Sequence, residues 1–286
     1  MYVIEIPFLD LEQVYNTNQG LRWVKMLDNS FIIPFRDQAL KVLQDKERFV
    51  MYCTDEQFYD IWFHYFDLQT DYSMYNFKIK SASKHEPYFK VCANRGKGIR
   101  LLNQDLFEVI ILSIISNNEP INNARLLTNK FMHVLGEKHT KKIKGAGNII
   151  WYEFPSHFTI LENQDKLSIL GNEQKAKEII SICQDIHDEW LSLNMLENME
   201  TKYAKEYLKD LGSINENVIN HIIALGLKRN IFPIDNQMQY ILEKQLGCDN
   251  YNMFNEWYLK EMNIGGLEGY LHQLMCYNHN NPPKEV

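Results

Sequence analysis

The chain has 286 residues, 45% of them apolar and 13% aromatic, which is typical of a globular protein with a substantial core and excludes a disordered chain. Its formal net charge of −7 counts against a nucleic-acid partner, although the lysine-rich run 138–144 and Lys228 with Arg229 leave room for one basic face. No apolar run reaches the ~18 residues of a membrane span, the acidic start lacks a secretory signal, and five scattered cysteines without a CxxC pair predict free thiols in the cytoplasm.

The first 95 residues predict strands. The segments VYNTNQGLRWVKM, NSFIIPFRDQALKVLQD and RFVMYCT are rich in β-branched and aromatic residues, and NQG and DNS between them suit turns. An antiparallel meander is the simplest topology for these strands. After residue 98 the apolar spacing becomes helical, and GEKHTKKIKGAGNIIWYEFPS is interpreted as a loop between helices. The expected fold is therefore α+β, with an N-terminal antiparallel β domain over 1–97 and a helical domain over 98–286.

The stretch GIRLLNQDLFEVIILSIISNN predicts a long apolar helix. Asp105 is a candidate N-cap, and Glu108 three residues later completes a capping-box pattern. Asn117 and Asn118 end the helix, and their amide groups suit the edge of an unpaired base. An ordinary polar helix end explains the same residues, and on chemistry alone it is the favoured interpretation.

The stretch LGSINENVINHI has a helix–turn–helix outline. Asn215 can cap the second helix, and Val218, Ile222 and Leu225 are spaced to form its buried face. Backbone N–H groups at such a turn can hold a phosphate. Many helical proteins contain such hairpins, so this pattern alone does not indicate DNA binding.

The stretch FPID places Asp235 at the head of a helical run. The positive end of the helix dipole helps to keep a carboxylate ionised there. From spacing alone a plain N-cap is the favoured interpretation, but in a cleft the same carboxylate could stabilise an oxocarbenium ion or orient water for glycosidic cleavage. The sequence contains no recognisable metal motif, glycine-rich phosphate loop or nucleophile triad, so no metal or cofactor is expected.

These stretches, with NQGLRW at residues 18–23, occur in an order that resembles the 8-oxoguanine DNA glycosylases of the helix–hairpin–helix superfamily over nearly the whole chain. The resemblance implies an N-terminal antiparallel sheet, a helical bundle and a base pocket between them. It also implies that the partner is double-stranded DNA, from which a damaged or modified nucleotide is flipped out. Neither a membrane nor an obligate protein partner is expected, and the implied protein is a cytoplasmic monomer that associates with the nucleoid when bound to DNA.

The resemblance assigns roles to individual residues. Asp235 falls on the catalytic aspartate, and Asn117 or Asn118 on the asparagine that fills the gap opposite the flipped base. Six further residues fall on or near other DNA-contacting positions of the family: Arg125 and Lys175 on arginines that read the partner base, Gln174 on an aromatic wedge, Gln237 on a phosphate-contacting histidine, and Ser213 with Asn215 on the hairpin glycines.

Four residues fall in the base pocket that the resemblance implies. Asn18 replaces the glycine that recognises 8-oxoguanine, His272 and Cys276 replace a glutamine and a phenylalanine, and Asn220 is the fourth pocket position. These replacements indicate that the pocket does not bind 8-oxoguanine in the standard way.

The main departure from the family is at its nucleophilic lysine. Counting back from PID places Glu216 there, and no lysine lies between Lys209 and Lys228. Without the amine no imine with the sugar forms, so the lyase step is not expected. If Glu216 faced Asp235, one pKa of the pair would rise, and the two carboxyls could activate water. Three functions stay open: a monofunctional glycosylase, a catalytically inactive DNA-binding relative, and a protein-interaction module without a DNA role.

Overall fold

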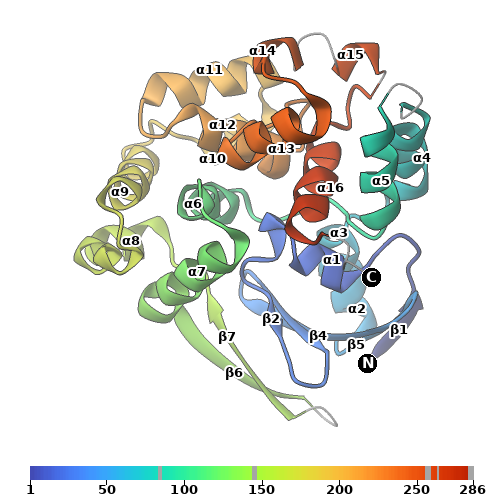
Figure 1. The fold of residues 1–286 in the computed structure, drawn as a ribbon. Coiled ribbons are helices and arrows are strands. Elements are labelled where there is room, and N and C mark those ends of the chain that lie inside the picture. Colours follow the sequence, from blue (N-terminus) through green and yellow to red (C-terminus); the bar gives the residue numbers. More distant parts are fainter. Residues whose placement is uncertain (83–85, 144–146, 255–258, 263, 283–286) are drawn as a thin grey trace.

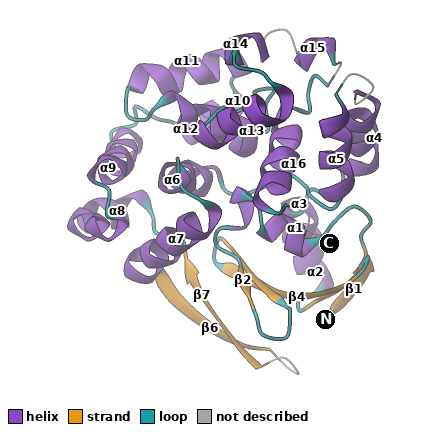
Figure 2. Cartoon of the chain, viewed as in Figure 1, coloured by secondary structure: helices purple, strands orange, loops and turns teal. Residues whose placement is uncertain are grey.

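A computed structural model describes residues 1–82, 86–143, 147–254, 259–262 and 264–282. The predicted α+β class is confirmed: the strands gather on one side of the molecule and helices form the rest (Figure 2). No helix in these ranges is long and apolar enough to cross a bilayer. The cysteines are free thiols, and among them only Cys248 is not fully buried.

The N-terminal sheet is antiparallel, as predicted. Its strands are β1 (Tyr2–Glu5), β2 (Val24–Lys25), β3 (Phe31–Phe35), β4 (Gln38–Asp45) and β5 (Arg48–Met51), in the order β1-β5-β4-β3-β2. The last four form the expected meander, and β1 pairs with β5 at the outer edge. A short helix α1 (Leu11–Tyr15) and a 3-10 turn η1 (Asn18–Gly20) connect β1 to β2.

The prediction of strands up to residue 95 is wrong after residue 51. The chain there forms α2 (Asp55–Gln57), the π-turn η2 (Phe58–Trp62), α3 (Phe63–Tyr65), α4 (Tyr72–Ala82) and α5 (Pro87–Arg95). Thr54 starts the first of these with a capping box to Gln57. Phe58, Trp62 and Phe66 follow at a spacing of four, so their aromatic rings lie on one helical face and cover the sheet.

The interpretation of residues 136–156 as a loop is also wrong. Strands β6 (Glu137–Ile143) and β7 (Gly147–Glu153) form an antiparallel hairpin that projects beside the sheet (Figure 1). Ile149 and Trp151 alternate on one face of β7 and pack on Ile32 of the sheet. Ile143 is the only buried residue of β6. The sequence of this strand therefore lacks the apolar alternation that marks a half-buried strand. Lys144 lies outside the described residues.

The helical region surrounds α6, whose residues are buried on nearly all sides, as a run of apolar residues without a polar face requires. The elements of this region are α6 (Leu106–Ser116), α7 (Ile121–Leu135), α8 (His157–Glu162), η3 (Gln164–Leu170), α9 (Glu173–His187), α10 (Leu193–Asn198), α11 (Thr201–Leu211), α12 (Glu216–His221), η4 (Ile222–Gly226), α13 (Asn236–Leu246), α14 (Tyr251–Met253), α15 (Leu259–Glu261) and α16 (Glu268–Asn280). Helix α5 packs on α16, and α4 and α5 share a core with the C-terminal helices.

Two sequence blocks that support the family resemblance meet as a structural joint. The buried Gln19 amide donates to the Arg100 carbonyl (3.0 Å) and accepts from the Leu102 N–H (2.7 Å). The Arg100 guanidinium donates to the carbonyls of Pro7 and Phe8 and lies 4.7 Å from the ring centre of Tyr72. The joint therefore fixes the start of the chain against the segment that leads into α6.

A buried ion pair provides a second connection between the sheet region and α6. Asp105 caps α6 through the Glu108 N–H (3.2 Å), as predicted, but the Glu108 side chain does not complete the capping box. It forms a salt bridge with Arg22 instead, and the two side chains are 5% and 3% exposed. Arg22 also donates to the Tyr152 carbonyl of β7 (2.7 Å), so one guanidinium ties α6, the η1–β2 segment and the hairpin together.

Candidate active site

The predicted helix–turn–helix is present as α11, a four-residue turn and α12. Gly212 ends α11 in the left-handed region (φ 68°), and Asn215 caps α12 by accepting from the Val218 N–H (3.1 Å). The Ser213 hydroxyl donates to the Asp185 carboxylate, and the Asn215 amide donates to Glu178 (3.4 Å). The two side chains expected near DNA phosphates therefore contact carboxylates of α9.

Asp235 is the N-cap that its spacing predicted, and its second carboxylate oxygen faces a neighbouring side chain. Its Oδ1 atom caps α13 by accepting from the Met238 N–H (2.8 Å). Its Oδ2 atom lies 3.6 Å from Nε2 of His221, and the two side chains are 13% and 10% exposed. The carboxylate is thus fixed by the helix N-terminus on one side and faces an imidazole on the other.

No role for His221 is predicted from the sequence. A signal was present, since this is the only ionisable side chain in the apolar run VINHIIAL. In the structure its Nδ1 atom lies 2.9 Å from the Asn217 carbonyl oxygen one turn earlier in α12. The ring packs edge-on against His272 of α16, with ring centres 5.3 Å apart.

His272 and Cys276, predicted as pocket residues, do lie together behind this pair. The Cys276 Sγ atom is 3.7 Å from His272 Nε2. Both residues are buried, so burial raises the pKa of the Cys276 thiol well above its usual value. Burial, and then the charge of His221, lower the pKa of His272 to about 3. Both groups are therefore neutral near pH 7.

The low pKa of His272 predicts a pH-dependent stability. An unfolded histidine takes up a proton below pH ~6.5, whereas the folded His272 does not until about pH 3. The free energy of unfolding should therefore fall as pH is lowered through this window, with His272 contributing a slope of about 1.4 kcal/mol per pH unit. Urea denaturation of the wild type and His272→Gln at pH 7, 6 and 5 measures that contribution. Parallel stability curves for the two proteins would contradict the assignment.

Asn18 lies at a small cavity beside His221. The cavity measures about 20 Å³, room for roughly one water molecule. It is lined by polar side chains that sequence reasoning did not assign to a pocket, Gln104 and Ser113, together with Ser116. Asn220 does not line it, and its buried amide oxygen has no hydrogen-bond partner among the described residues. A flipped base would have to open this cavity.

His221, Asp235 and His272 also offer the donor types that bind transition metals. One ligand atom from each lies within 4.8 Å of the others. Asp235 already uses one oxygen as the cap of α13, and the His272 nitrogens lie against Cys276 and the Gln273 amide (3.2 Å). We therefore interpret the cluster as a site for charge and proton chemistry.

Glu216 does not form the expected pair of acids with Asp235. Its carboxylate lies 2.9 Å from Lys205 Nζ and 3.5 Å from Lys209 Nζ, both on α11. The hydrogen bond and charge of Lys205 lower its pKa, whereas an acid pair would have raised one. The side chain is half exposed because the first residue of α12 points back toward α11.

The residues expected to read the partner base already have protein partners. Lys175 is 6% exposed; its Nζ atom donates to the Ile115 carbonyl at the end of α6 (2.8 Å) and pairs with Glu119 (2.6 Å). The Arg125 guanidinium stacks over the Tyr15 ring at 3.8 Å and donates to the Tyr15 carbonyl (2.7 Å). Lys175 is therefore not available as a DNA-facing residue, and Arg125 would have to leave Tyr15 to read a base.

The other predicted contacts are more accessible. Asn118 is exposed in a left-handed conformation (φ 57°), which asparagine tolerates, at the turn that follows α6. Asn117 precedes it as the C-cap of α6. Gln174 is exposed on α9 and donates to Glu178 (3.2 Å). Gln237 donates to the Asn280 side chain of α16 (2.7 Å).

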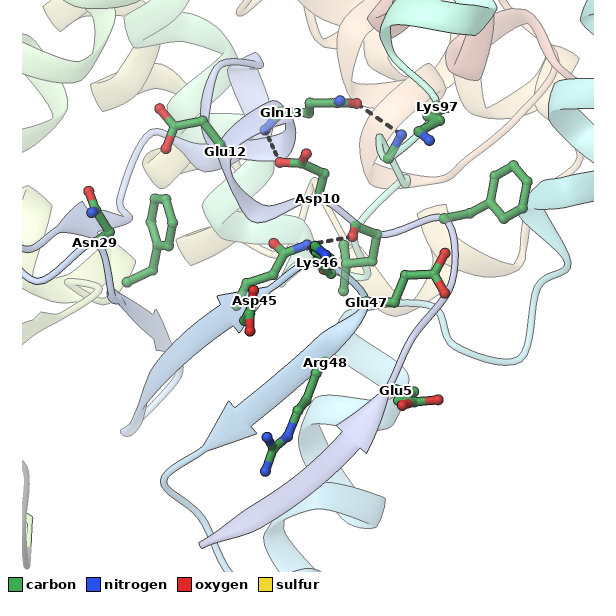
Figure 3. Close-up of a pocket in the computed structure, with 15 residues that line it drawn as sticks. Glu5, Asp10, Glu12, Gln13, Asn29, Asp45, Lys46, Glu47, Arg48 and Lys97 are labelled. Carbon is green, nitrogen blue, oxygen red and sulfur yellow. Dashed lines mark hydrogen bonds between the residues drawn. The ribbon is translucent and has the colours of Figure 1, made fainter.

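A pocket of about 980 Å³ lies away from this site. Figure 3 shows it between α1 and the strands β1, β4 and β5. Its charged lining consists of Glu5, Asp10, Glu12, Asp45, Glu47, Lys46, Arg48 and Lys97. Carboxylates outnumber the cations there, so the pocket does not suit a phosphate backbone.

Comparison with known proteins matches the sheet region and the fold. Residues 2–110 match the model of the 8-oxoguanine DNA glycosylase N-terminal domain. Over 97% of each chain, the structure superposes with a TM-score of 0.83 and 22% identity on a Clostridium acetobutylicum 8-oxoguanine glycosylase/lyase, solved with double-stranded DNA containing cytosine opposite 8-oxoguanine. It also matches a 3-methyladenine DNA glycosylase from Archaeoglobus fulgidus, with a TM-score of 0.75 and 18% identity over 99% of this chain and 100% of that one. A comparison with curated protein sequences found no match.

Proposed function

We propose that this chain is a monofunctional DNA glycosylase, because residues 2–110 match the model of the 8-oxoguanine DNA glycosylase N-terminal domain and the fold is that of solved DNA glycosylases. It flips a damaged or modified base out of duplex DNA and hydrolyses the bond between that base and its sugar. Strand cleavage is left to other enzymes, because α12 does not supply the amine that a lyase needs.

The position of Asp235 carries this proposal. Cleavage of an N-glycosidic bond builds positive charge on the sugar, and a fixed carboxylate lowers the energy of that state. Asp235 is held in place by the N-terminus of α13 and is only 13% exposed, so its charge is weakly screened. The fixed orientation and the partial burial of this carboxylate support the proposed role.

The changed pocket favours a substrate other than 8-oxoguanine. Asn18 brings an amide to the cavity beside His221, with Ser113 and Ser116 on the facing helix α6. These groups offer both donors and acceptors to the edge of a base. The proposed substrate class is therefore a modified base recognised through polar contacts.

A catalytically inactive DNA-binding protein is the second candidate. The internal partners of Lys175 and Arg125 favour it, because these contacts compete with reading of the partner base. At the hairpin, the Ser213 hydroxyl donates to the Asp185 carboxylate. This contact competes with phosphate binding and so also favours the inactive protein.

The test is release of base from duplexes that carry 8-oxoguanine, uracil, alkylated bases or modified cytosines, each assayed with and without hot alkali. A monofunctional glycosylase gives strand breaks only after alkali. Breaks without alkali, trapped by borohydride, would show that another amine acts as the nucleophile. Binding without release from any duplex would support the inactive protein.

A further inference from the structure

His221 is held with one nitrogen directed toward Asp235. Its Nδ1 atom lies 2.9 Å from the Asn217 carbonyl oxygen, and a carbonyl can only accept a hydrogen bond. The ring proton of the neutral imidazole is therefore on Nδ1. Nε2, which faces the Asp235 carboxylate, carries a lone pair and can accept a proton.

The distance between these two groups suits a bridging water molecule that sits beside the line joining them. Nε2 and Oδ2 are 3.6 Å apart, longer than a direct hydrogen bond and too short for a water directly between them. A water about 2.8 Å from both would meet them at an angle of about 80°, about 25° below its own H–O–H angle. Both groups are acceptors, so such a water donates both hydrogens and turns its oxygen lone pairs outward. This is the orientation that a nucleophilic water needs.

The geometry points to His221 as the general base that activates the attacking water, with Asp235 as its partner. The inference rests on the proposed function and adds a catalytic residue to it. The water oxygen forms a bond to C1′ of the deoxyribose, and the bond from C1′ to the base nitrogen breaks. The electron pair leaves with the base, which takes a proton from solvent, and the water proton passes to Nε2 of His221.

The surroundings of His221 suit this role. The titratable groups that face it are Asp235, from the segment before α13, and His272 with Cys276 behind it, from α16. Because His272 and Cys276 stay neutral, the imidazolium formed at His221 is next to one carboxylate and no other cation of the cluster. From α6, the groups at the adjoining cavity are the uncharged Ser113 and Ser116.

Glu216 is a poorer candidate for the base. Its carboxylate is bound to Lys205 and Lys209, which hold it ionised but reduce its proton affinity. It also lies at the first residue of α12, whereas His221 ends that helix beside Asp235.

The test compares wild type with His221→Asn under single-turnover conditions, on whichever duplex of the panel releases its base. Asparagine can keep the hydrogen bond to the Asn217 carbonyl but has no atom in place of Nε2. We expect the rate at neutral pH to fall about 100-fold, as for removal of a general base. A general base acts only while it is unprotonated, so the wild-type rate should fall toward low pH, and the variant should lack that fall. The exposed His187 on α9, changed to Gln, is the matched control and should keep both rate and profile.

Affinity for a duplex with a tetrahydrofuran abasic site separates catalysis from binding, and we expect it to be unchanged in His221→Asn. A variant with the wild-type rate overturns the inference. So does a slower variant that keeps the low-pH fall, because that would show a structural role. If the wild type releases no base from any duplex, the proposed function fails and the inference fails with it. If the wild type releases a base and His221→Asn does so at the same rate, the inference fails and the proposed function stands.

Discussion

Asp235→Asn should lower the single-turnover rate of base release about 1,000-fold, because it removes the negative charge that faces the developing positive charge on the sugar. Asparagine caps a helix as well as aspartate does, so the Met238 N–H keeps its acceptor. The free energy of unfolding should therefore change by less than about 1 kcal/mol. Rapid-quench kinetics and urea denaturation of the same preparation measure the two effects.

Asp10→Asn is the matched control for this experiment. Asp10 caps α1 through the Gln13 N–H (3.0 Å), as Asp235 caps α13, but it lies at the N-terminal pocket of Figure 3. Its rate of base release should equal that of the wild type. If Asp235→Asn instead keeps a rate within about tenfold of the wild type, its carboxylate supplies too little stabilisation to be the catalytic group.

The second large effect is expected on stability. Glu108→Ala should cost about 3–5 kcal/mol, because it leaves the charge of Arg22 buried without its carboxylate. The double variant Arg22→Met/Glu108→Leu should recover most of this loss, since apolar residues of similar volume avoid burying any charge. Urea denaturation of the single and double variants measures both values.

A surface ion pair provides the comparison. Lys25 and Glu12 lie 2.6 Å apart, but their side chains are 35% and 48% exposed. Glu12→Ala should therefore cost no more than about 1 kcal/mol. A Glu108→Ala cost in that same range would mean that water reaches Arg22 in the folded protein.

The sequence predicted the sheet, the hairpin between α11 and α12, and Asp235 at the head of a helix, because each depends on local signals. Turns, caps and alternation are properties of neighbouring residues. The helices after residue 51 were missed because Phe58, Trp62 and Phe66 are strand formers by composition, and their helical spacing is a weaker signal than their identity.

The errors in the site have a different origin. Counting back from Asp235 placed Glu216 in the family's lysine position but could not show that its side chain turns toward α11. His221 reaches Asp235 only because α12 and the start of α13 meet in the folded chain. Likewise, nothing near Lys175 in the sequence shows that its ammonium group ends on a carbonyl of α6.

The joint between Gln19 and Arg100 affects which positions of this sequence can be substituted during evolution. The Arg100 guanidinium donates to main-chain carbonyls, and the Gln19 amide also bonds main-chain atoms. Main-chain partners are present whatever side chains surround them, so this joint constrains few other positions. Side chains elsewhere in the chain, Glu216 and Asn18 among them, can therefore be replaced over evolutionary time without breaking these hydrogen bonds. If the chain acts as proposed, substitutions at such positions can alter the base that it recognises while its folding stays intact.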